Sequence, residues 1–296
     1  GCAWTAVPSQ TWITVTAGNT GNLNGSISYR VAANTSQQSR AGAINVSGQI
    51  FQVRQAGSDN PVITSITNAA SFVRNSAAPG TIVAVFGSRL GPAELSGAQL
   101  TDDGLFLSKS VAGVRVLFDT TPGAIVFTRQ DVTAAIVPYN TAGKSSVKVV
   151  VEAQGVRSNE YELPLAAVAP GLFTTQASGS GPGAVQNSNF SLNGVGNPAL
   201  RGDFVIIYAT GEGLLTPPAE DGKLTGADLP QAVAPVDVFI GGARAEVLYK
   251  GGAVGATAGL LQINAIVPLA AQPGTVSLDV RIGSVPAQSG VTMVIR

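Results

Sequence analysis

The side chains of this chain that could perform acid–base chemistry are carboxylates, because its 296 residues include no histidine. Without histidine, every Ser-His-Asp or Cys-His arrangement is excluded, together with the commonest metal ligand. Four carboxylates could in principle supply the pair that hydrolyses a glycosidic bond: Glu212, Glu220, Asp221 and Glu246. The sequence places no two of them in a motif, so we expect a protein that is not an enzyme and has no catalytic residue.

Two acidic turns and one lysine motif are candidates for binding an ion or a phosphate. The turns Asp102-Asp103-Gly104 and Glu220-Asp221-Gly222 offer oxygen ligands to calcium, but no second acidic cluster with loop spacing accompanies them. Gly143-Lys144-Ser145 ends like a phosphate-binding loop, yet Pro138 stands where that motif requires glycine. Cys2 is the sole cysteine, which excludes an intrachain disulfide and a cysteine-based zinc site. We predict solvated turns, no metal and no cofactor.

Trp4, Trp12 and Tyr29 are the residues that could bind a sugar, since carbohydrate faces stack on exposed aromatic rings. Trp12 opens a strand in which Ile13 and Val15 alternate with it, so one of the two sets must face solvent. Two interpretations stay open: a glycan-stacking surface, or a core role for both tryptophans, which we favour.

The elements that must position these side chains are short β-strands. Residues 1–57 alternate between apolar and polar side chains in the segments 12–16, 26–31, 43–46 and 50–53. Asn- and Gly-rich turns separate these segments, and the spacing over 46–50 predicts a tight hairpin. Four such strands make half of a β-sandwich.

Residues 1–57 resemble the BACON domain, an immunoglobulin-like module of bacterial surface and secreted proteins. The motifs that carry the resemblance are Cys2-Ala3-Trp4-Thr5-Ala6, Trp12-Ile13-Thr14-Val15, Gly25-Ser26-Ile27-Ser28-Tyr29, Ala33-Asn34, Arg40-Ala41-Gly42 and Phe51-Gln52-Val53-Arg54-Gln55-Ala56-Gly57. Members of that family normally have further strands before the Cys-x-Trp element, which implies that the opening strands are missing here. The family's name reflects a suggestion of carbohydrate binding, but no motif fixes a binding residue.

A sandwich without its opening strands exposes an edge of unpaired backbone groups, which is a template for another strand. If the chain is the mature form, we expect a β-strand from a neighbouring copy to pair with residues 1–57, linking subunits head to tail into a fibre. Residues 289–295 are one candidate donor, which we rank below an unspecified one. The alternative is that the chain is simply cut at Gly1.

The remainder of the chain repeats itself. Segments recur at a constant spacing of 122 residues, which becomes 130 after one insertion, so the two halves are predicted to be copies of one all-β domain. The matching pairs are 79–87 with 201–209, 114–116 with 236–238, 125–127 with 247–249, and 134–138 with 264–268. We expect Val83 to be equivalent to Val205 and Pro138 to Pro268, with Phe86 and Tyr208 both at buried strand positions.

Both copies resemble known immunoglobulin-like modules. The first, with Pro61-Val62-Ile63-Thr64-Ser65-Ile66 and Phe86-Gly87-Ser88-Arg89-Leu90-Gly91, is similar to IPT/TIG domains. The second, with Ala169-Pro170-Gly171-Leu172-Phe173 and Tyr208-Ala209-Thr210-Gly211-Glu212-Gly213, is similar to an uncharacterised C-terminal domain of large exported acidobacterial proteins. The resemblance implies three tandem immunoglobulin-like β-sandwich domains, at 1–57, 60–165 and 166–296, the last with a long entry loop.

Composition narrows the function further. Charged residues make up 11% of the chain, with 17 basic and 17 acidic side chains, so no electrostatic footprint for nucleic acid is expected. No apolar run is long enough to span a membrane. We therefore expect an extracellular or cell-surface bacterial protein that is structural or adhesive, a filament or matrix subunit whose partners are copies of itself. The alternative is a carbohydrate-binding accessory module of a larger exported protein, with glycans as partners.

Overall fold

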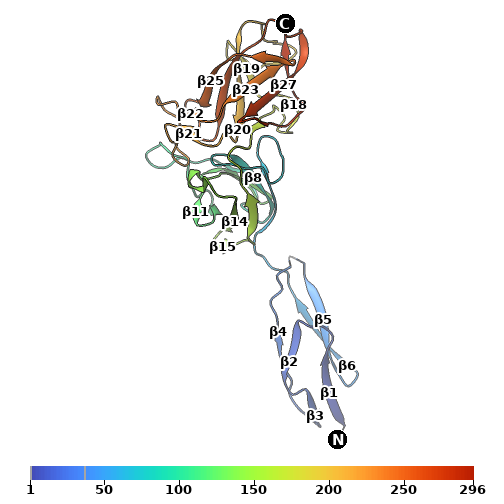
Figure 1. Ribbon diagram of the computed structural model, residues 1–296. Coiled ribbons are helices and arrows are strands. Elements are labelled where there is room, and N and C mark those ends of the chain that lie inside the picture. The colour runs from blue at the N-terminus through green and yellow to red at the C-terminus, as the bar shows by residue number, and fades with distance from the viewer. Residues whose placement is uncertain (1, 37) are drawn as a thin grey trace. The chain divides into compact units, whose positions relative to one another are not determined.

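The computed structural model describes residues 2–36 and 38–296 and divides the chain into two compact units, residues 1–60 and 61–296. Strands build both units (Figure 1), and the one helical element among the described residues is a short 3₁₀ turn, η1, at Tyr139–Thr141. No helix in the described part of the chain is long and apolar enough to cross a membrane. The predicted fold class, all-β with tandem immunoglobulin-like sandwiches, is confirmed.

Residues 1–60, the N-terminal unit, form a small sandwich of two sheets. A four-stranded sheet has the order β3-β1-β5-β6, and β2 pairs with β4 in a second sheet. The strands are β1 Ala3–Pro8, β2 Ile13–Ala17, β3 Thr20–Asn22, β4 Ser28–Val31, β5 Arg40–Val46 and β6 Gln49–Gln55. Ala6, Ile44 and Val53 from one sheet meet Ile13 from the other in the core. Among the described residues this core holds four buried apolar side chains, so little apolar burial stabilises the unit.

The predicted hairpin at residues 46–50 is present. Ser47 and Gly48 connect β5 to β6, and both have positive φ, 49° and 94°. Two central residues with positive φ make the turn whose twist matches that of the flanking strands, which is why glycine suits the second position. The strands β1 and β3 lie outside the four segments that alternation predicted.

The first sandwich of the C-terminal unit lies within residues 62–164. One sheet has the order β7-β8-β13-β12-β9, and the other has the order β11-β10-β14-β15 with β16 also paired to β14. The strands are β7 Val62–Asn68, β8 Ile82–Ser88, β9 Ser96–Gly97, β10 Val114–Phe118, β11 Thr121–Pro122, β12 Ile125–Thr128, β13 Val132–Ile136, β14 Ser146–Ala153, β15 Val156–Arg157 and β16 Tyr161–Pro164. Val83 and Val85 of one sheet pack with Val116 and Val149 of the other.

The second sandwich lies within residues 171–295. Its sheets have the orders β17-β20-β26-β25-β22-β21, with β19 paired to β20, and β18-β29-β27-β23-β24, with β28 paired to β27. The strands are β17 Gly171–Leu172, β18 Gly181–Pro182, β19 Val185–Asn187, β20 Phe204–Thr210, β21 Leu215–Thr216, β22 Gln231–Ala232, β23 Val236–Ile240, β24 Ala243–Ala245, β25 Val247–Gly252, β26 Leu261–Ile266, β27 Gly274–Ile282, β28 Val285–Pro286 and β29 Val291–Ile295. Because residues 61–296 form one compact unit, the boundary at 165/166 stays a proposal.

Strand register supports the predicted repeat. Val83 lies opposite Ala135 in the first sandwich, and Val205 lies opposite Ala265 in the second. The β12–β13 pair shifts register between residues 125 and 127, and the β25–β26 pair shifts between 247 and 249. Both the pairing and the irregularity recur at the spacing read from the sequence, so residues predicted to be equivalent lie on equivalent strands.

The prediction that Phe86 and Tyr208 are buried is wrong, because both side chains are half-buried. Alternate residues of a strand point to opposite faces. On β8 the core face carries Val83 and Val85, so Phe86 points to the outer face of the sheet. Tyr208 occupies the same outer face of β20, where its hydroxyl donates to Gln186 Oε1 at 2.9 Å.

This difference in burial predicts unequal costs of truncation. Phe118 is 1% exposed, so Phe118→Ala should lower the free energy of unfolding by about 3–5 kcal/mol, whereas Phe86→Ala should cost roughly half as much or less. Denaturant unfolding followed by circular dichroism measures both, since the two tryptophans lie in the N-terminal unit and their fluorescence would not report this sandwich. Equal losses for the two variants would contradict the assignment.

Candidate functional site

Trp4 lies on β1 with its ring packed over two glycines. The indole Nε1 donates a hydrogen bond to the Leu23 carbonyl oxygen at 2.9 Å. A Cβ atom at Gly21 or Gly25 would come within 2.4 or 2.5 Å of the ring's Cζ2 atom. The half-buried ring is therefore held by the adjacent backbone, and only glycine leaves room for it there.

Trp12 is half-buried against the core of the N-terminal unit, and a cation covers its ring. The Arg40 guanidinium carbon lies 4.4 Å from the ring centroid, within cation–π range. Arg40 is itself oriented by donating to the Ala32 carbonyl oxygen and to Gln55 Oε1, at 2.6 and 2.9 Å. A sugar stacking on that face would have to displace Arg40.

Tyr29, the third candidate for glycan stacking, lies on β4 and is 41% exposed. It meets Phe51 of β6, which is 52% exposed, with ring centroids 5.7 Å apart and an interplanar angle of 62°. The structure thus brings Tyr29 together with Phe51, which was not predicted as a site residue. Phe51 shares the inward face of β6 with Val53. Strand alternation could therefore have indicated Phe51 from the sequence, as an aromatic residue at a core-facing position.

The two rings border a cavity of about 300 Å³ that we call the aromatic cleft, lined by Ile27, Tyr29, Ile44, Val46 and Phe51. Apolar side chains line it almost entirely. Among the described residues, β6 pairs only with β5 and β4 only with β2, so each strand has one edge without a partner strand. The cleft therefore lies between the two sheets and beside two strand edges.

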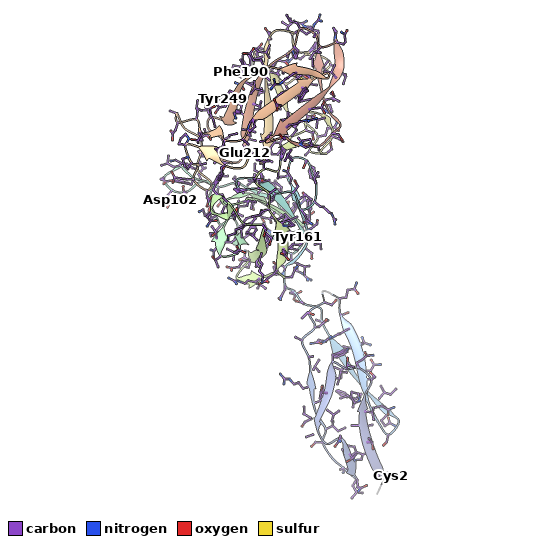
Figure 2. The ribbon with its side chains drawn as sticks, in the orientation of Figure 1. Cys2, Asp102, Tyr161, Phe190, Glu212 and Tyr249 are labelled. Atoms are coloured by element: carbon purple, nitrogen blue, oxygen red, sulfur yellow. The ribbon has the colours of Figure 1, made fainter. Side chains whose placement is uncertain are left out.

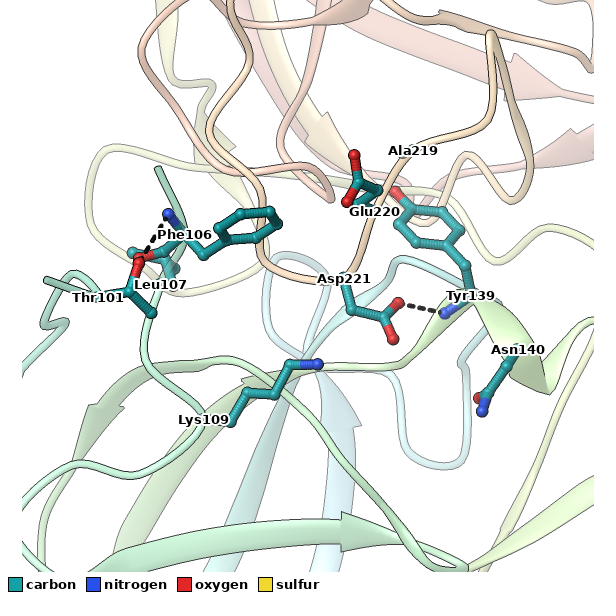
Figure 3. A pocket seen from close by; sticks show the side chains of 9 residues that line it. All are labelled: Thr101, Phe106, Leu107, Lys109, Tyr139, Asn140, Ala219, Glu220 and Asp221. Atoms are coloured by element: carbon teal, nitrogen blue, oxygen red, sulfur yellow. Dashed lines mark hydrogen bonds between the residues drawn. The ribbon is translucent and has the colours of Figure 1, made fainter. Parts of the chain in front are cut away.

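The C-terminal unit has a second candidate site where its two sandwiches meet. A cavity of about 590 Å³, which we call the junction pocket (Figure 3), is lined by Thr101, Phe106, Leu107, Lys109, Tyr139, Asn140, Ala219, Glu220 and Asp221. Leu107 N–H donates to the Gly222 carbonyl oxygen at 2.8 Å, and Leu224 N–H donates to the Leu105 carbonyl oxygen at 2.8 Å. These two bonds join the loop before β10 to the loop after β21.

The acidic turns contribute to the structure in two ways. Asp103 Oδ1 accepts from the Thr101 hydroxyl and the Leu105 N–H, and these bonds lower the pKa of the carboxyl. Asp221 Oδ1 accepts from the Tyr139 N–H at 2.7 Å, which ties the second acidic turn to η1. No group of three or more potential metal ligands occurs in the described part of the chain. The second turn is thus part of the contact between the sandwiches.

The four carboxylates singled out for hydrolysis have different surroundings. Glu246 is exposed, and Glu220 is exposed beside Lys223, with 2.6 Å between Oε1 and Nζ. Asp221 is half-buried. Glu212, labelled in Figure 2, is 1% exposed and lies in the loop that follows β20.

Glu212 occupies a position where the first copy has a core leucine. The repeat spacing of 122 places Glu212 on Leu90, which is fully buried. Gly211, with φ 85°, corresponds to Arg89, with φ 55°, so the backbone bends in the same way. A Cβ at Gly211 would lie 1.9 Å from the Ala169 carbonyl oxygen, which requires glycine here. The repeat alone could have identified this buried acid.

Burial raises the pKa of the Glu212 carboxyl to about 8, and the backbone N–H groups of Glu212 and Gly211 offset part of that rise. Glu212 Oε2 and the Tyr139 hydroxyl are both buried and have no hydrogen-bond partner in residues 2–36 and 38–296. Burial, and then the charges of Glu212 and Asp221, raises the pKa of Tyr139. The carboxyl is therefore mostly neutral at pH 7, and it is not among the residues that line the junction pocket.

No protein-family model matches the chain, and no curated protein matches it in sequence. It is similar to the solved structure of SGBP-B from a xyloglucan utilization locus in Bacteroides uniformis, at 15% identity and a TM-score of 0.23, covering 78% of this chain and 48% of that one. It is also similar to the Bacteroides ovatus mixed-linkage glucan utilization locus SGBP-B in complex with a heptasaccharide, at 10% identity and a TM-score of 0.34, covering 99% and 64%.

A tandem of titin domains I9–I11 matches at 8% identity and a TM-score of 0.23, covering 98% of this chain and 93% of that one. The chain spans less than two thirds of either SGBP-B structure. At these identities and TM-scores the likenesses carry no argument about function. The resemblances to the BACON and acidobacterial domains stay predictions.

The raised pKa of Glu212 predicts how stability changes with pH. The unfolded carboxyl ionises near its ordinary pKa of 4.5, while the folded one keeps its proton until about pH 8. Stability should therefore fall as the pH rises between these values. Glu212→Gln, which mimics the neutral acid, should leave the protein unchanged near pH 4 and stabilise it by roughly 2–4 kcal/mol at pH 8.

Denaturant unfolding of both proteins at a series of pH values measures the difference, and Glu246→Gln, at an exposed carboxylate, is the control. The difference in stability between variant and parent isolates the contribution of Glu212. The pKa values of Asp103, Asp119 and Asp131 are lowered, so these carboxyls change stability at more acidic pH. A stability difference that does not depend on pH would refute the assignment.

Proposed function

We propose that the protein is a non-catalytic bacterial protein of the cell surface or the extracellular matrix that assembles through β-strand edges. The observation that carries this proposal is the aromatic cleft, an apolar cavity beside the edges of β4 and β6 that have no partner strand in the described part of the chain. The lack of histidine and the sparse charge support a structural rather than a catalytic role.

A strand from a second copy is the occupant that suits the cleft. An added strand gains main-chain hydrogen bonds along an open edge, and its alternate side chains enter the apolar space. Tyr29 and Phe51 leave a large part of their rings exposed to such a strand. Water would otherwise contact these apolar surfaces.

The donor strand is not residues 289–295 in their present conformation. β29 pairs with β27 and β18, and Val291, Met293 and Ile295 are buried in the core of the second sandwich. Donating this segment would expose that core. Another strand or a different segment of the partner copy is the better donor.

A charge in the cleft should prevent this assembly. Light scattering over a range of concentrations, with electron microscopy of the assembled protein, should show oligomers for the parent chain and their loss for Phe51→Asp, because a buried charge is costly. Leu248→Asp in β25 is the matched control, since Leu248 is 54% and Phe51 52% exposed. A parent chain that stays monomeric at high concentration, with both units folded, would end the proposal.

Carbohydrate binding is the second candidate function, and the exposed pair Tyr29 and Phe51 favours it. Exposed rings offer apolar faces to a sugar. Affinity electrophoresis through gels that contain neutral polysaccharides tests it: a retardation that Tyr29→Ala abolishes would support a glycan in the cleft, and no retardation in any polysaccharide would contradict it.

A further inference from the structure

The junction pocket combines an aromatic ring with polar groups that have free hydrogen-bonding capacity. Figure 3 shows the Phe106 ring on one side of the pocket, with the Lys109 amine, the Asp221 carboxylate and the Asn140 amide on the others. The cavity, at about 590 Å³, lies in the range of small-ligand sites.

Three polar side chains leave donors and acceptors unused. Lys109 is half-buried and has no ion-pair or hydrogen-bond partner in the part of the chain that the structure describes. Asp221 uses Oδ1 for the Tyr139 N–H, and its second oxygen has no partner among the same residues. Asn140 donates to the Thr121 hydroxyl at 2.9 Å, which leaves its carbonyl oxygen available. A ligand would meet both donors and acceptors.

The charges of the lining argue for a neutral ligand. Lys109 and Asp221 carry opposite charges, and Glu220 is already paired with Lys223 at 2.6 Å. With Lys223 counted as the partner of Glu220, although it does not line the pocket, these four charges cancel, so neither an anion nor a cation finds a surplus of opposite charge. A molecule with several hydroxyl groups can use the lysine as a donor and the carboxylate as an acceptor.

The walls of the pocket are held in place before any ligand arrives. Leu105 and Leu107 pair with Leu224 and Gly222 across the junction, and Asp221 is held by the Tyr139 N–H. Gly222, with φ 79°, packs where a Cβ would lie 2.8 Å from Ala124 Cβ. Fixed walls reduce the ordering cost of binding.

We propose that the junction pocket binds a neutral carbohydrate. The apolar face of a sugar ring packs on Phe106, while Lys109 donates to its hydroxyl groups and Asp221 Oδ2 accepts from them. Asn140 contacts a neighbouring sugar unit at the open rim. The site lies in residues 61–296, so it does not depend on the aromatic cleft or on strand assembly.

Isothermal titration of the full chain with neutral oligosaccharides, namely gluco-, xylo-, manno- and galacto-oligosaccharides, tests the proposal, with oligogalacturonate as the acidic counterpart. At least one neutral series should bind, and oligogalacturonate should not. Phe106→Ala and Lys109→Met should each weaken that binding by about tenfold or more, because they remove the stacking ring and the donor. Lys148→Met, at an exposed lysine on β14, is the matched control and should leave binding unchanged.

Circular dichroism of each variant verifies folding. Asp221→Asn is a further, conservative variant, because its side-chain oxygen still accepts from the Tyr139 N–H. Three outcomes would overturn the proposal: no neutral oligosaccharide binds the folded chain, only the acidic one binds, or binding survives Phe106→Ala and Lys109→Met but is lost in Tyr29→Ala. None of these outcomes bears on strand assembly, which light scattering measures separately.

Discussion

The pairing of two loops across the junction of the sandwiches is the contact on which the C-terminal unit depends. Leu105 and Leu107 exchange backbone hydrogen bonds with Leu224 and Gly222, and Ile82 N–H donates to the Thr210 hydroxyl at 2.9 Å. Main-chain groups buried at such a junction must find partners, so each sandwich satisfies donors of the other. The junction pocket follows from this arrangement.

The two units differ in how completely they bury their apolar side chains. Each sandwich of residues 61–296 encloses a continuous core between its two sheets. The N-terminal unit buries Ala6, Ile13, Ile44 and Val53 and leaves Phe51 and Tyr29 exposed at the cleft. The open strand edges and the uncovered apolar surface of this smaller unit are the features on which the proposed assembly rests.

Glu212 marks a difference between the two sandwiches that the sequence predicts to be copies of one domain. Leu90 fills a buried position in the first copy, and the same position in the second copy carries a carboxyl that burial keeps mostly protonated at neutral pH. An acid in that place lowers stability as the pH rises, whereas leucine does not. The position therefore distinguishes the second sandwich from the first through a single ionisable group.

Strand alternation and a constant spacing can both be read along the linear chain, so they were enough to predict the all-β class and the repeat. The sequence could not show whether other segments cover the outer faces of the sheets that contain β8 and β20. The expected burial of Phe86 and Tyr208 was therefore wrong. Nor could the sequence pair Tyr29 with Phe51, or bring Lys109 and Asp221 to one pocket, since these residues lie far apart in the chain. Only tertiary packing places such residues together, because it depends on contacts between sheets and loops that no local pattern encodes.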